Sequence, residues 1–448
     1  MTTPPNRQQS GSGLRRRLLR TTGAAAAAAV LIALAGCSGS SGATTLDPKA
    51  KVTIEVWSGQ ADAAQQEIEA LTKEFEKQHP NVTVDLSPGA SSTDQLLQKL
   101  SAGFAGGQYP DMSYAFGSWA GQLEASGRTL DISAEVKKPE VKWDEFTAAA
   151  RGTAQPTGTK VIGFPAVVDN IGLLYNKTLF DKAGLAYPTA DWTWDDFRTA
   201  AKKLTDTANH VYGYAYSVSG SEETTWQFWP HLWQNGGEIL NKDATKSEFA
   251  SQAGVDALTF LQKMAVDDKS VYLDQTDVKF GQLFTSNRIG MITSGPWQLS
   301  DLKTGGTNYG VVPLPGTNGD HQTASGPDIW ALFDHQDKNR AYWATQFAEW
   351  LTSAEQDERF NVAIGNLPLR SSEAGSEAVK KESAEYPGYE VFVANSANVK
   401  ETRPTTKGYA ALSVAIGKAI SQVLQGDGEP KAALEQAAKT ADAALNKK

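Results

Sequence analysis

Strand and helix patterns alternate along the first part of the folded region, and this alternation constrains the fold more than any other feature. Apolar and polar residues alternate over 52–56, as in a strand, and apolar residues over 64–75 then share one helical face. The same two patterns repeat over 82–86 and 96–104, and a short apolar strand follows Asp111. The order β-α-β-α-β predicts an α/β fold with a largely parallel sheet.

Three loops of this predicted sheet are the first places to look for a site. Ligands of parallel α/β sheets bind beyond the carboxyl ends of the strands. We therefore expect functional side chains in the loops after Val56, after Asp111 and around Asp169.

Further helices are predicted downstream. Thr193 precedes an acidic first turn, which is typical of a capped helix. Trp343 and Trp350 share a helical face with other apolar residues, so we expect both in the core. Residues 409–424 and 430–445 predict two C-terminal helices.

The N-terminus is typical of an export signal. Residues 1–36 contain an arginine cluster and an apolar run, 24–35, which is too short to span a bilayer and suits a signal peptide. The run ends at Cys37 in Leu-Ala-Gly-Cys, which resembles a bacterial lipobox and implies a lipid on this thiol. We expect residues 37–50 to tether the protein to the outer face of the bacterial cell membrane. The Arg-Arg-x-Leu-Leu pattern at 15–19 leaves both the general secretory and the twin-arginine export routes open.

Composition excludes several classes of protein. The chain of 448 residues has a net charge of −9, and five of its arginines lie before Cys37, so the remainder is more acidic still. An acidic body without a basic cluster is not typical of a nucleic-acid-binding protein. Cys37 is the only cysteine and the five histidines are scattered, so we expect no disulfide framework, metal site or cofactor.

Catalytic motifs are not evident. The P-loop, the dinucleotide-binding glycine motif and the serine nucleophile elbow are all absent from the sequence. Residues 300–303 match S-x-x-K and residues 303–305 match K-T-G, but both matches use Lys303, which cannot fill both roles. We therefore assign no catalytic residue, although the sequence alone leaves a glycosidase-type carboxylate pair open.

Several segments in a fixed order resemble the family 1 extracellular solute-binding proteins of bacterial ABC importers, the group that contains maltose-binding protein. Together they cover most of residues 52–370, and the lipobox at 34–37 strengthens the resemblance. The matching segments are IEVW at 54–57, GGQYPD at 106–111, LYNK at 174–177 followed by Phe180, Gly184 and Thr193-Trp194, NGGE at 235–238, MITSGPW at 291–297 and YGVVPLP at 309–315.

The resemblance implies a two-lobed periplasmic-binding-protein fold with a ligand cleft between the lobes and hinge strands that cross between them. Lobe 1 would comprise residues 50–168 and 312–371, and lobe 2 residues 172–306 and 375–448. Such proteins close on their solute by hinge motion and deliver it to a membrane permease without covalent chemistry. We expect a monomeric binding protein and not an enzyme.

The same resemblance implies sugar-binding positions in lobe 2 and at the crossing. Asp169 stands where a sugar-binding carboxylate is found, and Trp297 and Trp226 stand where aromatic rings stack on sugars. Two structural alternatives stay open, namely that Asp169 caps a turn and that Trp226 belongs to an apolar helical stripe with Trp229 and Trp233. We expect Trp229 itself in the core.

Other expected ligand contacts are less specific. In lobe 1 they are the residues that follow the first and third strands, Gln60, Phe116, Ser118 and Trp119. Maltose-binding protein has charged residues near Ser118 and Trp119, which argues against maltose itself. Asp328 and Arg370 are expected at the cleft edge, and Tyr409 matches a cleft tyrosine.

A sugar ligand is the main expectation. Aromatic faces cover the C–H faces of a sugar, and carboxylates, amides and arginine bind its hydroxyl groups. A di- or oligosaccharide carried to an ABC permease fits these residues. Two other classes stay open, namely a binding protein for a polyamine or a phosphodiester and a surface enzyme that acts on glycans.

Overall fold

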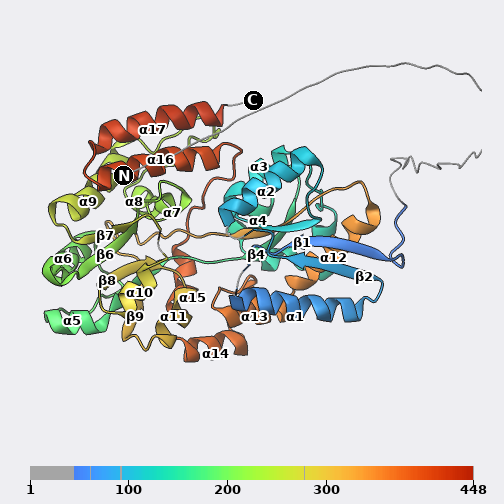
Figure 1. The fold of residues 1–448 in the computed structure, drawn as a ribbon, viewed down its shortest axis with the longest axis horizontal. Coiled ribbons are helices and arrows are strands. Elements are labelled where there is room, and N and C mark those ends of the chain that lie inside the picture. Colours follow the sequence, from blue (N-terminus) through green and yellow to red (C-terminus); the bar gives the residue numbers. More distant parts are fainter. Residues whose placement is uncertain (1–44, 61, 91–92, 277, 447–448) are drawn as a thin grey trace, which may run out of the picture. The chain divides into compact units, whose positions relative to one another are not determined.

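The computed structural model describes residues 45–60, 62–90, 93–276 and 278–446 (Figure 1). The expected signal peptide and the lipidated Cys37 lie outside the described residues. Within these ranges the chain forms two mixed sheets of five strands, each with helices packed against it. No helix in the described ranges is long and apolar enough to cross a membrane.

The first sheet has the strand order β2-β1-β3-β10-β4. Its strands are β1 (Val52–Trp57), β2 (Val82–Ser87), β3 (Met112–Ala115), β4 (Gly163–Val167) and β10 (Asp328–Leu332). β10 pairs antiparallel with both β3 and β4, and the other four strands run parallel to one another. The predicted largely parallel sheet and its β-α-β-α-β start are confirmed.

Amphipathic helices bury the faces of this sheet. The apolar positions of the first predicted helix, such as Ile68, Leu71 and Phe75, are buried in one core with Ile54 and Trp330. The helices are α1 (Asp62–Gln78), α2 (Thr93–Gly106), α3 (Ala120–Ala125), α4 (Ala148–Ala154), α12 (Lys338–Leu351) and α13 (Ala354–Phe360). In α12, Trp343 is buried and Trp350 is partly buried against the same core, as predicted.

The second sheet has the order β7-β6-β8-β5-β9. Its strands are β5 (Gly172–Asn176), β6 (Tyr212–Ser217), β7 (Val271–Asp274), β8 (Ile289–Ser294) and β9 (Tyr309–Val312). Here β5 is the antiparallel strand, paired with β8 and β9. Each sheet therefore contains one reversed strand, β10 or β5, and both of these strands follow a crossing of the chain from one sheet to the other.

Two apolar cores cover this second sheet. Thr193 caps α6 with a reciprocal capping box to Asp196, and the two C-terminal helices, α16 and α17, have the predicted bounds and pack against each other. The helices are α5 (Lys177–Ala183), α6 (Trp194–Leu204), α7 (Glu222–Trp226), α8 (Trp229–Gln234), α9 (Gln252–Gln262), α10 (Phe280–Thr285), α11 (Gln298–Thr304), α14 (Glu377–Glu385), α15 (Tyr389–Asn395), α16 (Tyr409–Leu424) and α17 (Pro430–Leu445).

The segments that cross between the sheets are tied to one another. Asn170, between β4 and β5, donates to the carbonyl oxygen of Phe392 at 2.9 Å and accepts from the amide of Asn395 at 2.8 Å. Its backbone also bridges to Ser325, in the segment before β10, and the neighbouring Val168 bridges to Leu367. Because the crossing segments share these bonds, the side chains on them hold fixed positions relative to one another.

Candidate functional site

Asp169 lies on the first crossing segment, where it meets the segment before β10. Its carboxylate accepts the backbone N–H of Gly326 at 2.8 Å, and its carbonyl oxygen accepts the hydroxyl of Ser325 at 2.6 Å. The carboxylate therefore keeps one oxygen in a bond to the protein. Burial raises the pKa of Asp169 to about 7, and the charge of Asp328 adds to this rise.

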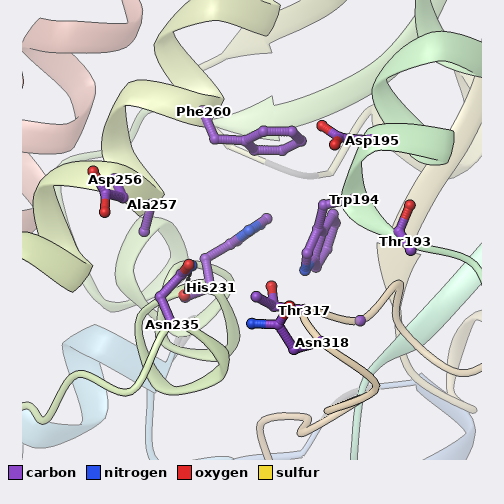
Figure 2. Close-up of a pocket in the computed structure, with 11 residues that line it drawn as sticks. Thr193, Trp194, Asp195, His231, Asn235, Asp256, Ala257, Phe260, Thr317 and Asn318 are labelled. Carbon is purple, nitrogen blue, oxygen red and sulfur yellow. Dashed lines mark hydrogen bonds between the residues drawn. The ribbon is translucent and has the colours of Figure 1, made fainter.

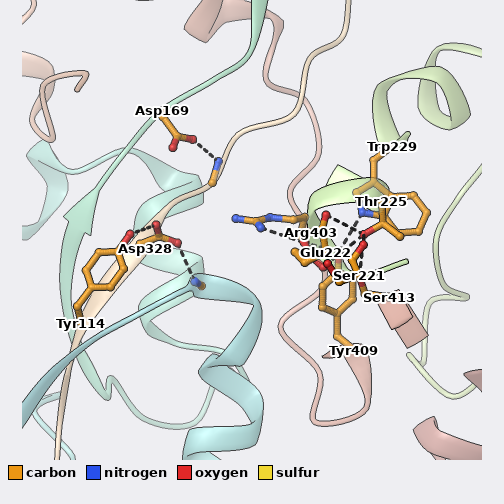
Figure 3. A network of polar contacts seen from close by, with 12 residues as sticks. Tyr114, Asp169, Ser221, Glu222, Thr225, Trp229, Asp328, Arg403, Tyr409 and Ser413 are labelled. Atoms are coloured by element: carbon orange, nitrogen blue, oxygen red, sulfur yellow. Dashed lines mark hydrogen bonds and ion pairs between the residues drawn. The ribbon is translucent and has the colours of Figure 1, made fainter. Parts of the chain in front are cut away.

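Asp328 is the first residue of β10 and is buried. Its carboxylate accepts the hydroxyl of Tyr114, on β3, and the backbone N–H of Gly117 at 3.0 Å (Figure 3). Burial raises the pKa of Asp328 to about 6, against the opposing effect of the Arg403 charge. Burial also raises the pKa of Tyr114 well above its usual value, so Tyr114 stays a hydroxyl donor at physiological pH.

Arg403 faces the two aspartates from the segment that precedes α16. It is buried, donates to Glu222 at 2.9 Å, and places its guanidinium carbon 4.7 Å from the centroid of the Trp226 ring. Figure 3 shows its guanidinium pointing from the Glu222 side toward the side that holds Asp328 and Asp169. We call these five residues (Asp169, Glu222, Trp226, Asp328 and Arg403) the acidic–aromatic cluster.

Gly326 shows how closely this cluster is packed. A Cβ atom at this position would lie 2.7 Å from Nη2 of Arg403, 2.9 Å from Cζ3 of Trp226 and 3.0 Å from Oδ1 of Asp169. Three side chains from three distant segments therefore converge on one glycine. The structure brings the predicted residues Asp169, Trp226 and Asp328 together.

A buried chain of hydrogen bonds holds Glu222 of the cluster in place. The indole N–H of Trp229 donates to the hydroxyl of Tyr409 at 2.9 Å, and that hydroxyl donates to Glu222 at 3.0 Å. Trp229 and Tyr409 are fully buried. Trp229 is thus a core residue, as predicted, and Tyr409 orients Glu222 from the core.

The predicted contacts from the first-sheet side lie at the carboxyl ends of β1 and β3. Gln60 is half-buried and follows Gly59, where an added Cβ would lie 2.8 Å from the Tyr114 ring. Phe116 is half-buried, with its ring centroid 6.1 Å from that of Tyr114. Ser118 and Trp119 are buried in the 3₁₀ turn Gly117–Trp119, whose first N–H binds Asp328.

Trp297 and Arg370 have opposite surroundings. Trp297 is 39% exposed and lies just before α11, with its ring packed on Gly295. Arg370 is buried over the ring of Phe146 and donates to the carbonyl oxygens of Thr352 and Val141. The guanidinium of Arg370 is bound by these backbone carbonyl groups of the core. The structure therefore gives no support to the expected position of Arg370 at a cleft edge.

A cavity of about 810 Å³ opens between the two sets of elements. Residues 121–125 and 156–160 of the first-sheet side line one wall, and residues 242–244 and 404–407 line the other. The second wall follows directly after Arg403, and Thr405 donates to the carbonyl oxygen of Pro156 at 3.4 Å across the gap. Residues 404–407 of this interlobe cavity are therefore continuous in sequence with Arg403 of the acidic–aromatic cluster.

Three residues of the site region were not predicted from the sequence: Tyr114, Glu222 and Arg403. Glu222 follows β6, so the rule that sites lie at the carboxyl ends of strands could have found it. Tyr114 lies in a strand and Arg403 in a loop, and neither has a local pattern that marks it. Within the described ranges, no group of three or more His, Cys, Asp or Glu side chains could hold a metal ion.

Several known proteins are similar to this chain in sequence and in structure. The sn-glycerol-3-phosphate-binding periplasmic protein UgpB of Brucella melitensis is 26% identical, over 88% of this chain and 94% of its own. The ABC substrate-binding protein Lmo0181 of Listeria monocytogenes, in complex with cycloalternan, superposes with a TM-score of 0.78 at 26% identity and 89% and 100% coverage.

A third protein shares the fold. The cyclic α-maltosyl-1,6-maltose binding protein of Arthrobacter globiformis superposes with a TM-score of 0.76 at 23% identity, covering 88% of this chain and 99% of its own. The expected two-lobed periplasmic-binding-protein architecture is confirmed. The family model described as bacterial extracellular solute-binding protein matches residues 57–358, which is more than half of the chain. This chain therefore belongs to the bacterial extracellular solute-binding proteins, the binding components of ABC transporters.

Proposed function

We propose that this protein captures a sugar of two or more rings between its lobes and delivers it to an ABC importer permease. In this proposal lobe 1 comprises residues 50–168 and 312–371, and lobe 2 comprises residues 172–306 and 375–448. The sugar contacts are Asp169, Asp328 and Trp226 of the acidic–aromatic cluster, with Trp297 as a second stacking ring.

The charge balance of the cluster carries this proposal. Three carboxylates, Asp169, Asp328 and Glu222, surround one guanidinium, Arg403, which is already paired with Glu222. A carboxylate accepts hydrogen bonds from sugar hydroxyls, and charge-assisted bonds of this kind are stronger than neutral ones. An anionic solute would meet three acidic side chains that share a single guanidinium, so a neutral hydroxylated solute fits better.

A glycerophosphodiester or glycerol phosphate is the second candidate solute. Lys160, Lys242 and Lys407 line the interlobe cavity and supply positive charge, against the carboxylates of Glu124 and Asp243. The similarity to UgpB points the same way. This candidate predicts that the phosphate group lies among the lysines, away from Asp169 and Asp328.

Calorimetric titration separates the two candidates. The protein is titrated with maltotriose, cycloalternan and sn-glycerol-3-phosphate, and each titration is repeated with Asp169→Asn and with Lys407→Gln. The sugar proposal predicts binding of an oligosaccharide that Asp169→Asn weakens and Lys407→Gln leaves unchanged. If only sn-glycerol-3-phosphate binds, and if Lys407→Gln weakens that binding while Asp169→Asn does not, the solute is the anion and not a sugar.

Closure and anchoring belong to the same proposal. Because only the closed state contacts solute from both lobes, small-angle scattering of the saturated protein should give a smaller radius of gyration than the free protein. The sugar should be recovered chemically unchanged, as required of a binding protein. We further propose a monomer held at the outer face of the membrane by a lipid on Cys37.

A further inference from the structure

A second cavity, of about 300 Å³, lies among the helices of the second sheet and shares no lining residue with the acidic–aromatic cluster or the interlobe cavity (Figure 2). The beginning of α6, the helices α8 and α9, and the loop at 316–318 form its walls. Trp194 and Phe260 supply two aromatic walls, with their ring centroids 6.0 Å apart. The cavity lies apart from the residues that we propose to bind the transported solute.

His231 is the most unusual group in this cavity. Only 3% of the residue is exposed, and its ring centroid lies 4.0 Å from that of Trp194 and 5.8 Å from that of Phe260. Among the residues that the structure describes, none is hydrogen-bonded to its ring nitrogens. Figure 2 shows the ring directed into the space bounded by Phe260, Trp194 and Thr317.

An imidazole whose nitrogens have no protein partner and face a cavity leaves its hydrogen-bonding positions to whatever fills that cavity. Burial lowers the pKa of His231 to about 3, so the ring is neutral at physiological pH and offers one N–H donor and one acceptor nitrogen. The pattern suits a hydroxyl group, which both donates and accepts.

The rest of the lining selects against anions and favours hydroxyl groups. No lysine or arginine lines the cavity, whereas Asp195, Asp256 and the side chains of Asn235, Thr317 and Asn318 do. The indole of Trp194 is held in place by its N–H, which donates to Gln234 at 2.6 Å. A wall fixed in this way is preorganised, which lowers the entropic cost of binding.

We propose that this cavity is a second binding site for a neutral hydroxylated ring of monosaccharide size. His231 and the neighbouring amide groups bind the hydroxyls, and Trp194 and Phe260 cover the apolar face of the ring. The volume lies at the lower end of the range for small-molecule sites, which matches one sugar ring and not a chain of rings. The site does not depend on the function proposed for the interlobe cluster.

Saturation-transfer NMR on the full chain tests the proposal, with methyl α-D-glucopyranoside and methyl β-D-galactopyranoside as probes and choline as the cationic comparison. The measurements use a Trp226→Ala background, which weakens the interlobe site. We expect a transfer signal for at least one glycoside that persists in this background. Adding His231→Phe, which keeps an aromatic ring beside Trp194, should weaken that binding at least fivefold.

A second variant guards against misfolding of His231→Phe. Thr317→Trp places a large ring in the cavity from a half-exposed loop and should abolish the same signal. The proposal is overturned if neither glycoside gives a signal, if both variants leave the signal unchanged, or if only choline binds. Failure of the interlobe proposal would appear separately, as oligosaccharide binding that Trp226→Ala leaves intact.

Discussion

The guanidinium of Arg403 lies over the ring of Trp226, with 4.7 Å between its central carbon and the ring centroid, and donates to Glu222 at 2.9 Å. The cation–π contact and the ion pair together fix the orientation of both side chains. Glu222 is the carboxylate that pairs directly with Arg403, so Asp169 and Asp328 share the guanidinium charge only at longer range. Burial is the main cause of the raised pKa values of both aspartates, and the charge of Arg403 opposes the rise at each of them.

Two tryptophans three residues apart allow a matched test of the site. Trp226 is half-buried in the acidic–aromatic cluster, whereas Trp229 is fully buried in the core. Trp226→Ala should weaken sugar binding at least tenfold, about 1.4 kcal/mol, with little change in the melting temperature of the free protein. Trp229→Ala should instead lower the free energy of unfolding by about 3–5 kcal/mol. Calorimetry and thermal melting of both variants decide between these roles, and a large loss of stability in Trp226→Ala would assign Trp226 to the core.

The pKa of Asp169 predicts how stability depends on pH. The folded protein holds the proton of Asp169 up to about pH 7, whereas the unfolded chain releases it near 3.8. Because the folded state binds more protons between these values, the stability that Asp169 contributes is full below pH 3.8 and falls as the pH rises through 7.

Asp169→Asn removes this titration. The free energy of unfolding of the wild type, measured relative to Asp169→Asn by denaturant titration without ligand, should therefore decrease from pH 4 to pH 8. Asp328→Asn should reduce the size of this decrease, because the charge of Asp328 helps to raise the pKa of Asp169. A difference between wild type and Asp169→Asn that stays constant with pH would contradict the prediction.

The fold was largely predictable because its elements depend on local periodicity. The alternation over 52–56 and the helical pattern over 64–75 each need only neighbouring residues, and they correspond to β1 and α1. The C-terminal helices were likewise predicted with their bounds. The tie between the crossing segments was not predictable, since the bonds of Asn170 to Phe392 and Asn395 join residues more than 200 positions apart.

The site was predictable only where a motif or a strand end marked it. Asp169 and Asp328 were expected in the cleft, and the structure places them together. Arg403 has no local signal, because its importance comes from the long-range pair with Glu222. Arg370 is a different case, since the sequence predicts it at a cleft edge and the structure buries its guanidinium among backbone carbonyl groups. Burial of a charged side chain depends on tertiary contacts that sequence alone does not reveal.

The proposed membrane attachment depends on Cys37, the only cysteine of the chain. Cys37→Ala removes the thiol that would carry the lipid, so the protein should appear in the soluble fraction or the medium instead of the membrane fraction. Fractionation followed by immunoblotting measures this, with Ser38→Ala as the control that should stay at the membrane. Retention of Cys37→Ala in the membrane fraction would falsify the lipoprotein assignment.

Gly326 gives the most direct test that the acidic–aromatic cluster binds the solute. In Gly326→Ala the new methyl group would lie within 3.0 Å of Arg403, Trp226 and Asp169, so at least one of these side chains must move. Asp169 also accepts the N–H of this residue, which couples any shift of the backbone to the carboxylate. We expect sugar affinity to fall at least tenfold, about 1.4 kcal/mol.

Gly152, in α4, supplies the matched control. A Cβ there meets no atom within 4 Å, so Gly152→Ala should leave affinity unchanged and should stabilise the helix by roughly 0.5–1 kcal/mol. Calorimetric titration and thermal melting of both variants separate a local effect on the site from a general effect of replacing glycine. If Gly326→Ala binds sugar as tightly as the wild type, the solute does not contact this cluster, and the interlobe cavity near Lys407 becomes the place where binding must be sought.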